Sequence, residues 1–174
     1  MDVAHLKDHI RDIPDFPQPG IVFKDITPLL GDADAFRCTV DSLAAHFADR
    51  PIDKVVGIEA RGFILAAPIA HLLGAGFVPV RKPGKLPWRT RVEEYSLEYG
   101  TDRLEMHEDA IAPGDNVLVV DDVLATGGTA AATLRLVEAA GGTVVGLGFV
   151  IELAFLNGRS RVGDHEAVSL LTYE

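Results

Sequence analysis

Short, almost uniformly apolar runs alternate with helical patterns through the middle of the chain, and this alternation narrows the possible folds more than any other feature. The apolar runs are KVVGI (54–58), FVPV (77–80), VLVV (117–120) and TVVGLGFVI (143–151). Helical patterns at 62–74 and 129–140 follow the first and third runs and end at glycines. Strands without polar alternation are typical of parallel sheets that are covered on both faces. The pattern therefore predicts an α/β fold with a doubly wound, mostly parallel sheet.

The segments outside this core complete a single predicted domain, residues 1–174, because no repeat, low-complexity tract or linker divides the chain. Three prolines between 12 and 20 argue against regular structure there, and Asp32 is a suitable N-cap for the helix that follows. We expect helices at 2–11 and 33–49, an irregular segment at 12–20, a hairpin formed by YSLEYG and DRLEMH within the insertion 81–116, and an edge strand at 168–173.

The chain is acidic, with a formal net charge of -10 from 16 basic and 26 acidic residues. This balance argues against nonspecific binding to nucleic acid or to an anionic membrane surface. Five of the basic residues nevertheless gather in one short stretch, at Arg81, Lys82, Lys85, Arg89 and Arg91. Such a cluster indicates a small polyanionic ligand, although charge alone favours the alternative of a solvated basic loop.

The number of cysteines and the length of the apolar runs indicate the expected cellular location. Cys38 is the only cysteine, so no disulfide can form within the chain, and a cytoplasmic location is expected. The longest apolar runs are too short to cross a bilayer, and the opening sequence MDVAHLKDHIRDIP lacks the pattern of a signal peptide. We therefore expect no membrane partner.

Charged residues and glycines follow three of the predicted strands. Glu59 and Arg61 come after the first strand, the basic cluster comes after the second, and DDVLATGGT comes after the third. In an open parallel sheet, ligands bind beyond the carboxyl ends of the strands, which lie on one side. A purely structural sheet has no reason to place such residues at three exits. The sequence therefore predicts a polyanion-binding site at this edge.

The small residues at 125–129 have the composition of an anion-binding turn. Gly127 and Gly128 permit unusual backbone angles, so that several amides can point inward, and Thr126 and Thr129 add hydroxyl donors. An ordinary strand-to-helix turn is the alternative interpretation. The two acids before the turn pose a question, since two like charges ~4 Å apart repel by roughly 4 kcal/mol at an effective dielectric of ~20.

VLVVDDVLATGGT resembles the diphosphoribosyl-binding signature of type I phosphoribosyltransferases. Further segments, in the same order, resemble the adenine-specific branch of that family: 14–30, 57–63, 81–87, 95–111 and 152–159. The resemblance implies a base-binding hood at 1–31 and a mobile loop or hairpin insertion at 82–110. It also implies a homodimer that uses Mg²⁺ and converts adenine and 5-phosphoribosyl 1-diphosphate to AMP and diphosphate.

The resemblance also implies roles for individual residues. Ribose and the 5'-phosphate would be bound by Asp121, Asp122, Ala125, Thr126, Gly127, Gly128 and Thr129. The diphosphate would be bound by Glu59, Ala60, Arg61, Arg81, Lys82 and Lys85, and adenine by Val22, Phe23, Lys24 and Leu153. Glu98 and Arg61 would be catalytic, with Glu98 as acid–base group, and Tyr99 would belong to the lid. Magnesium would be held mainly by substrate and water, with no direct protein ligand.

Two other functions remain open at this point. A phosphoribosyltransferase for hypoxanthine, guanine or xanthine would share the signature, but the hood segment at 14–30 favours adenine. A non-catalytic regulator that senses phosphoribosyl diphosphate is the second alternative. It would require a DNA-binding domain or a broad basic face, and a chain with a net charge of -10 does not suggest either. Trp88 has no predicted role.

Overall fold

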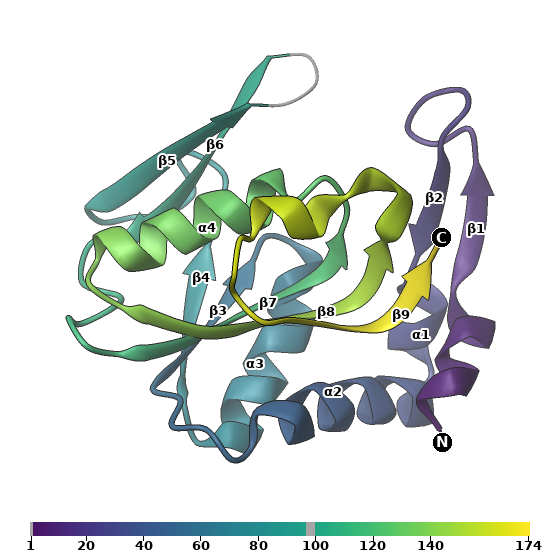
Figure 1. The fold of residues 1–174 in the computed structure, drawn as a ribbon, viewed down its shortest axis with the longest axis horizontal. Coiled ribbons are helices and arrows are strands. Elements are labelled where there is room, and N and C mark those ends of the chain that lie inside the picture. Colours follow the sequence, from purple (N-terminus) through teal and green to yellow (C-terminus); the bar gives the residue numbers. More distant parts are fainter. Residues whose placement is uncertain (1, 97–99) are drawn as a thin grey trace.

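The computed structural model describes residues 2–96 and 100–174, and its centre is a five-stranded sheet (Figure 1). The strands are β3 (Lys54–Ile58), β4 (Gly76–Val80), β7 (Asn116–Leu124), β8 (Thr143–Leu153) and β9 (Ala167–Tyr173). Their order is β4-β3-β7-β8-β9, and every neighbouring pair is parallel. The predicted sheet is thus confirmed, including the edge strand at the C-terminus. The strand order reverses between β3 and β7, which is where ligands bind in such sheets.

Helices cover both faces of the sheet, as Figure 1 shows. One face packs against α2 (Ala33–Phe47), α3 (Arg61–Leu73), the short α1 (Thr27–Gly31) and the 3₁₀ helix η1 (Val3–His9); the other packs against α4 (Gly128–Ala139). Val117 and Val119 belong to the apolar cluster on the α4 side, whereas Leu118 and Val120 belong to the opposite one. Since alternate side chains must fill two cores, these strands are apolar throughout. Among the described residues, no helix is long and apolar enough to span a bilayer.

The predicted hairpin is present on the α4 side, but its strands begin earlier than expected. Its strands are β5 (Thr90–Ser96) and β6 (Thr101–His107), which pair antiparallel from Thr90 opposite His107 to Ser96 opposite Thr101. Tyr95, Leu104 and Met106 bury their side chains in the α4-side core. Of the sequence YSLEYG, Tyr95 and Ser96 end β5, and residues 97–99 lie outside the described residues.

The prediction of an irregular segment at 12–20 is wrong in part. Arg11–Pro14 forms strand β1, which pairs antiparallel with β2 (Val22–Asp25). Pro14 is tolerated because β1 is an edge strand of a two-stranded sheet. Salt bridges across the pair, Arg11 to Asp25 and Lys24 to Asp12 at 2.7 Å each, reinforce it. This two-stranded element, which corresponds to the predicted hood, rises beside β9 (Figure 1).

Candidate active site

The turn between β7 and α4 forms a small concave nest. Gly127 has φ 78° and caps α4, and its position has no room for a side chain because a Cβ would overlap the carbonyl oxygen of Gly158. A cavity of ~70 Å³ lies inside the turn and is lined by residues 123–130 together with Asp121 and Phe149. One water needs roughly 10–15 Å³, so a larger group fits. The first-turn amides of α4 have no acceptor within the helix, which suits an anion.

The segment after β8 packs against the backbone of this nest. It contains the short 3₁₀ helices η2 (Ala154–Leu156) and η3 (Gly158–Arg161), and a Cβ on Gly158 would overlap the carbonyl oxygen of Ala125. The buried carboxylate of Glu152 accepts two hydrogen bonds of 2.6 Å from Arg159, which raise the pKa of that guanidinium. Sequence reasoning missed Gly158 as a support of the nest, because its neighbours Ala125 and Gly127 lie far away along the chain.

The two acids lie within β7 rather than after it, since that strand continues to Leu124. Asp122 is buried, and its carboxylate forms an ion pair with Arg61 at the start of α3. Asp121 is partly buried, and its Oδ1 accepts a 2.9 Å hydrogen bond from the amide of Asp122. A Cβ on Gly62 would lie 2.8 Å from that same oxygen, so α3 approaches β7 closely only because position 62 is glycine. Sequence reasoning missed Gly62.

The pKa of Asp121 lies well above its usual value. Burial of the carboxyl group is the main cause, and the charge of Asp122 adds to it. A single guanidinium, that of Arg61, is paired with the adjacent carboxylate of Asp122. Ionisation of Asp121 is therefore disfavoured in the free protein, and a cation or hydroxyl donors beside the two acids are favoured over a phosphate.

Asp121→Asn should stabilise the fold at neutral pH. The folded-state pKa is raised above the unfolded value of 3.8, so Asp121 lowers stability increasingly as the pH rises above about 4. Asparagine removes this cost, so we expect a higher Tm for the variant at pH 7 and little difference at pH 4. Thermal unfolding of both proteins at pH 4 and pH 7 measures the effect. The exposed Asp41→Asn serves as control, and a lower Tm for Asp121→Asn at pH 7 would contradict the assignment.

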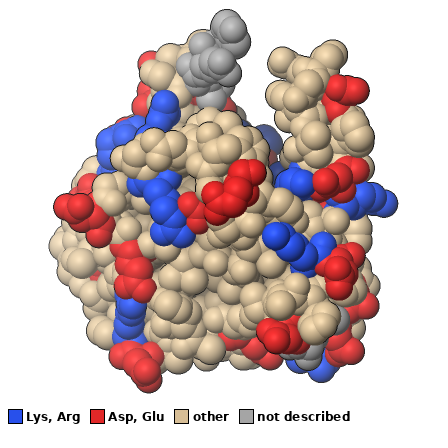
Figure 2. Space-filling model, turned by 45° about the vertical axis from the view of Figure 1, so that its right-hand side comes forward, with Lys and Arg blue, Asp and Glu red and all other residues tan. Residues whose placement is uncertain are grey.

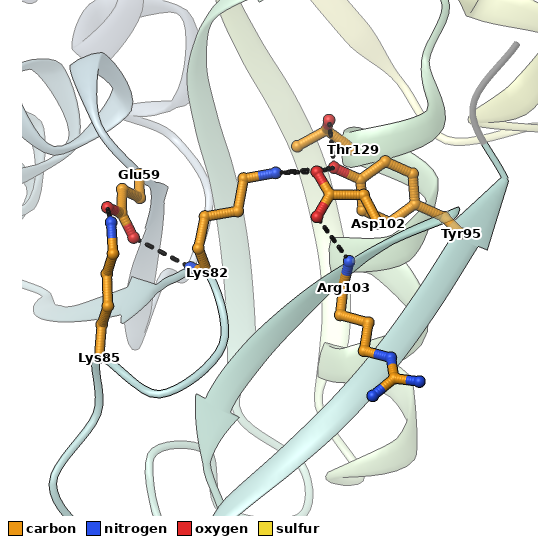
Figure 3. A network of polar contacts seen from close by, with 7 residues as sticks. All are labelled: Glu59, Lys82, Lys85, Tyr95, Asp102, Arg103 and Thr129. Atoms are coloured by element: carbon orange, nitrogen blue, oxygen red, sulfur yellow. Dashed lines mark hydrogen bonds and ion pairs between the residues drawn. The ribbon is translucent and has the colours of Figure 1, made fainter. Parts of the chain in front are cut away.

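Glu59 gathers the basic segment that follows β4. Its carboxylate forms an ion pair with Lys85 and accepts a 2.9 Å hydrogen bond from the amide of Lys82 (Figure 3). It also forms an ion pair with Arg81 at 3.3 Å. Burial alone would raise the pKa of Glu59, but these donors outweigh it and hold the pKa below its usual value. Glu59 is joined to Arg61 by the exposed Ala60 through a cis peptide bond. The structure thus brings Arg61, Arg81 and Lys85 to one edge of the sheet.

The ammonium of Lys82 points away from Glu59. It forms an ion pair with Asp102 of β6 and donates a 3.2 Å hydrogen bond to the hydroxyl of Tyr95 on β5 (Figure 3). The backbone of Lys82 is therefore held by Glu59, while its side chain is held by the hairpin. Sequence reasoning did not single out Tyr95 or Asp102.

The hood places an aromatic ring against the site. Phe23 packs edge-on against Phe16 at 5.2 Å between ring centroids, and the Arg61 guanidinium lies 5.3 Å from the Phe23 centroid. Val22 is exposed, and Lys24 uses its ammonium for Asp12 and for the ring of Tyr173 at 4.3 Å. Leu153 is partly buried at the end of β8.

A hollow separates the hood from the β5–β6 hairpin on this face, and acidic and basic side chains are interspersed around it (Figure 2). Glu98 and Tyr99 lie outside the described residues. Trp88 is exposed, with its ring edge-on to His107 at 6.5 Å. Nothing in this geometry gives Trp88 a function.

The chain resembles known proteins over nearly its whole length. Residues 35–170 match the model of the phosphoribosyl transferase domain. The adenine phosphoribosyltransferase of Myxococcus xanthus is 60% identical over 171 residues, 98% of this chain and 93% of that relative.

Solved structures agree with these sequence relatives. The adenine phosphoribosyltransferase of Thermoanaerobacter pseudethanolicus superposes with a TM-score of 0.96 at 51% identity, covering 99% of this chain and 100% of that one. The Saccharomyces cerevisiae enzyme, crystallised with adenine and an imino-altritol bisphosphate, has a TM-score of 0.91 at 41% identity and covers 97% of this chain and 98% of its own.

Proposed function

The chain belongs to the phosphoribosyl transferase family, and from this membership we infer that it converts adenine and 5-phosphoribosyl 1-diphosphate to AMP and diphosphate, a step of purine salvage. The observation that carries this function is the similarity, over nearly the whole chain, to relatives named for the same reaction. The site geometry supports it, because an anion nest follows β7 and basic side chains follow β3 and β4, all at the same edge of the parallel sheet.

The proposed substrate position divides the site into four parts. The 5'-phosphate binds in the nest formed by Ala125, Thr126, Gly127, Gly128 and Thr129, and the ribose hydroxyls face Asp121 and Asp122. The diphosphate lies toward Arg61, Arg81, Lys82 and Lys85, which Glu59 and Ala60 help to position. Adenine stacks on Phe23, with the backbone of Val22 and Lys24 at its edge and Leu153 opposite. This division answers the question of the two acids, since they address the sugar and not the phosphate.

The reaction breaks the bond from ribose C1 to the diphosphate oxygen and forms a bond from C1 to adenine N9, while adenine loses a proton. Positive charge develops on the ribose as the diphosphate leaves. Arg61 stabilises the charge of the leaving group, and such preorganised donors are often the largest catalytic contribution. Glu98 manages the proton at N7 or N9. The hood and the hairpin limit the access of water to the ribosyl cation.

Magnesium fits this site as an ion carried by the substrate. Across residues 2–96 and 100–174, no three His, Cys, Asp or Glu side chains are grouped to hold a metal. Mg²⁺ generally keeps several waters and binds substrate phosphates. Asp121 and Asp122, of which only Asp122 pairs with Arg61 among the described residues, would hold the waters and ribose hydroxyls around the ion. When bound, magnesium would offset the charge of the diphosphate and of these acids.

A homodimer is supported by an apolar surface on α3 and β4. Ile64, Leu72 and Phe77 are large apolar residues that are 44%, 54% and 39% exposed. Phe77 belongs to β4, an edge strand of the central sheet, and such edges favour association with another chain. Phe77 also contacts Phe63, over which Arg81 lies at 5.9 Å, so the surface adjoins the basic segment of the site. A second copy packed here would cover the patch.

Phe77→Glu should therefore convert the dimer into a monomer. Burying a carboxylate in a desolvated interface costs free energy and opposes association. Sedimentation velocity of the wild-type and variant proteins gives their masses directly. Val92→Glu, which alters an exposed apolar residue of the hairpin, is the matched control. A wild-type monomer, or a Phe77→Glu dimer, would contradict the interface.

Product formation with separate bases tests the proposed function. We expect AMP from adenine with magnesium present, much less AMP after chelation of magnesium, and little product from hypoxanthine, guanine or xanthine. Formation of IMP or XMP without AMP would show a 6-oxopurine enzyme instead. Nucleic-acid binding at physiological salt without turnover of any base would favour the regulator.

A cytoplasmic location, which we propose from the single cysteine, is testable by fractionation of the source cells.

A further inference from the structure

A continuous set of polar contacts joins the basic segment to the phosphate-binding turn through the hairpin (Figure 3). Lys82 contacts both Asp102 and the hydroxyl of Tyr95, and that hydroxyl donates to Asp102 at 3.0 Å. The hydroxyl of Thr129, in the first turn of α4, donates to the same Tyr95 oxygen at 3.4 Å. The amide of Arg103 donates to the other oxygen of Asp102 at 2.8 Å and fixes the carboxylate. Two proposed substrate ligands, Lys82 and Thr129, thus share one partner on the hairpin.

Arg81, Lys82 and Lys85, the three cations of the basic segment, do not all pair with the same carboxylate. Arg81 and Lys85 pair with Glu59, at the end of a central strand, whereas Lys82 pairs with the hairpin. Within the described parts of the chain, Lys82 is therefore the one proposed diphosphate ligand of this segment whose side chain pairs with the hairpin. Tyr95 is 7% exposed, and its ring packs at Gly128, where a Cβ would lie 3.2 Å from Cδ2. The base of the hairpin is thus fixed against the turn.

We propose that Asp102 and Tyr95 are positioning residues that hold Lys82 and the β5–β6 hairpin against the phosphate-binding turn until the substrate diphosphate replaces Asp102 as the partner of Lys82. The proposal rests on the diphosphate role of Lys82 in the proposed function. Asp102 and the hydroxyl of Tyr95 hold the ammonium toward the hairpin, so a diphosphate that binds beside Arg81 and Lys85 can pair with it only after the Asp102 pair is lost. The free enzyme is stabilised by that pair, which opposes substrate binding.

The surroundings of the pair indicate how large this effect is. Burial lowers the pKa of Lys82, but hydrogen bonds with Asp102 and Tyr95 outweigh it and raise the pKa, so the side chain stays charged at neutral pH. The side chains of Lys82 and Asp102 are 38% and 31% exposed, and ion pairs of this kind contribute modestly. Removal of Asp102 should therefore tighten substrate binding by about two- to fivefold.

Calorimetric titration of Asp102→Asn with 5-phosphoribosyl 1-diphosphate and magnesium, at fixed ionic strength, tests the proposal. We expect a two- to fivefold lower Kd and KM, with an unchanged kcat, because the pair with Lys82 exists only before the substrate binds. In the Lys82→Met background, Asp102→Asn should have no effect on the Kd, since there is no ammonium to release. Fluorescence of Trp88, the only tryptophan, gives a second measure of binding.

Glu94→Gln is the matched control. It removes a carboxylate from the same hairpin, but one that pairs with Arg103 instead of Lys82, and it should leave the Kd unchanged. A Kd that is unchanged or higher in Asp102→Asn, an equal effect in Glu94→Gln, or an effect that persists in the Lys82→Met background would overturn the proposal. Wild-type enzyme that forms no AMP would instead refute the proposed function, so the two failures are distinguishable.

Discussion

Glu98→Gln is expected to lower kcat by about 10²–10⁴-fold while changing the KM of both substrates only slightly. Glutamine has nearly the same size as glutamate but cannot accept or deliver the proton of adenine N7 or N9. Glu98 belongs to the sequence between β5 and β6, outside the described residues, so this prediction depends on the family resemblance and on the place of the hairpin beside the site.

Steady-state kinetics with each substrate varied in turn measures this effect, and the pH profile of kcat should lose one ionisation in the variant. Glu93→Gln is the control, because Glu93 lies on the same hairpin and pairs with Arg135 on the outer side of α4. An increase in KM with an unchanged kcat would make Glu98 a binding contact of the closed site rather than an acid–base group.

Gly127→Ala is expected to raise the KM for 5-phosphoribosyl 1-diphosphate by roughly 10²-fold, the size of effect that follows from misplacing a substrate by about 1 Å. Two causes combine at this position. The φ of 78° is unfavourable for alanine, and the new Cβ would overlap the carbonyl oxygen of Gly158. The nest must therefore open, and its amides lose their common direction toward the 5'-phosphate.

Gly74→Ala separates these two causes. Gly74 has φ 66° and caps α3, but a Cβ there would meet nothing within 4 Å. Both variants should lose stability from backbone strain, and Gly127→Ala should lose more because of the overlap with Gly158, but Gly127→Ala alone should lose affinity for the substrate. Thermal unfolding and substrate titration of each variant give the two quantities. Equal affinity in both variants would remove the nest from the proposed site.

The fold followed from local patterns that need no knowledge of the partners. The apolar runs at 54–58 and 143–151 became β3 and β8, and glycines ended the helices between the strands. Charged residues lie at the carboxyl ends of β3 and β7, which is the point where the strand order reverses. The hood was less predictable. The prolines near its start argued against a strand, but pairing with β2 outweighed that local signal.

The partners of the site residues were decided only by tertiary structure. The sequence determined that Arg61, Lys82 and the acids of β7 would gather at one edge of the sheet, because strand exits share a side. It did not determine that Arg61 would pair with Asp122 or Lys82 with Asp102. Helix and strand periods arise between near neighbours, so the sequence displays them directly. Ion pairs and close backbone contacts, such as that of Gly127 with Gly158, depend on distances between residues far apart in the chain, which exist only after it has folded.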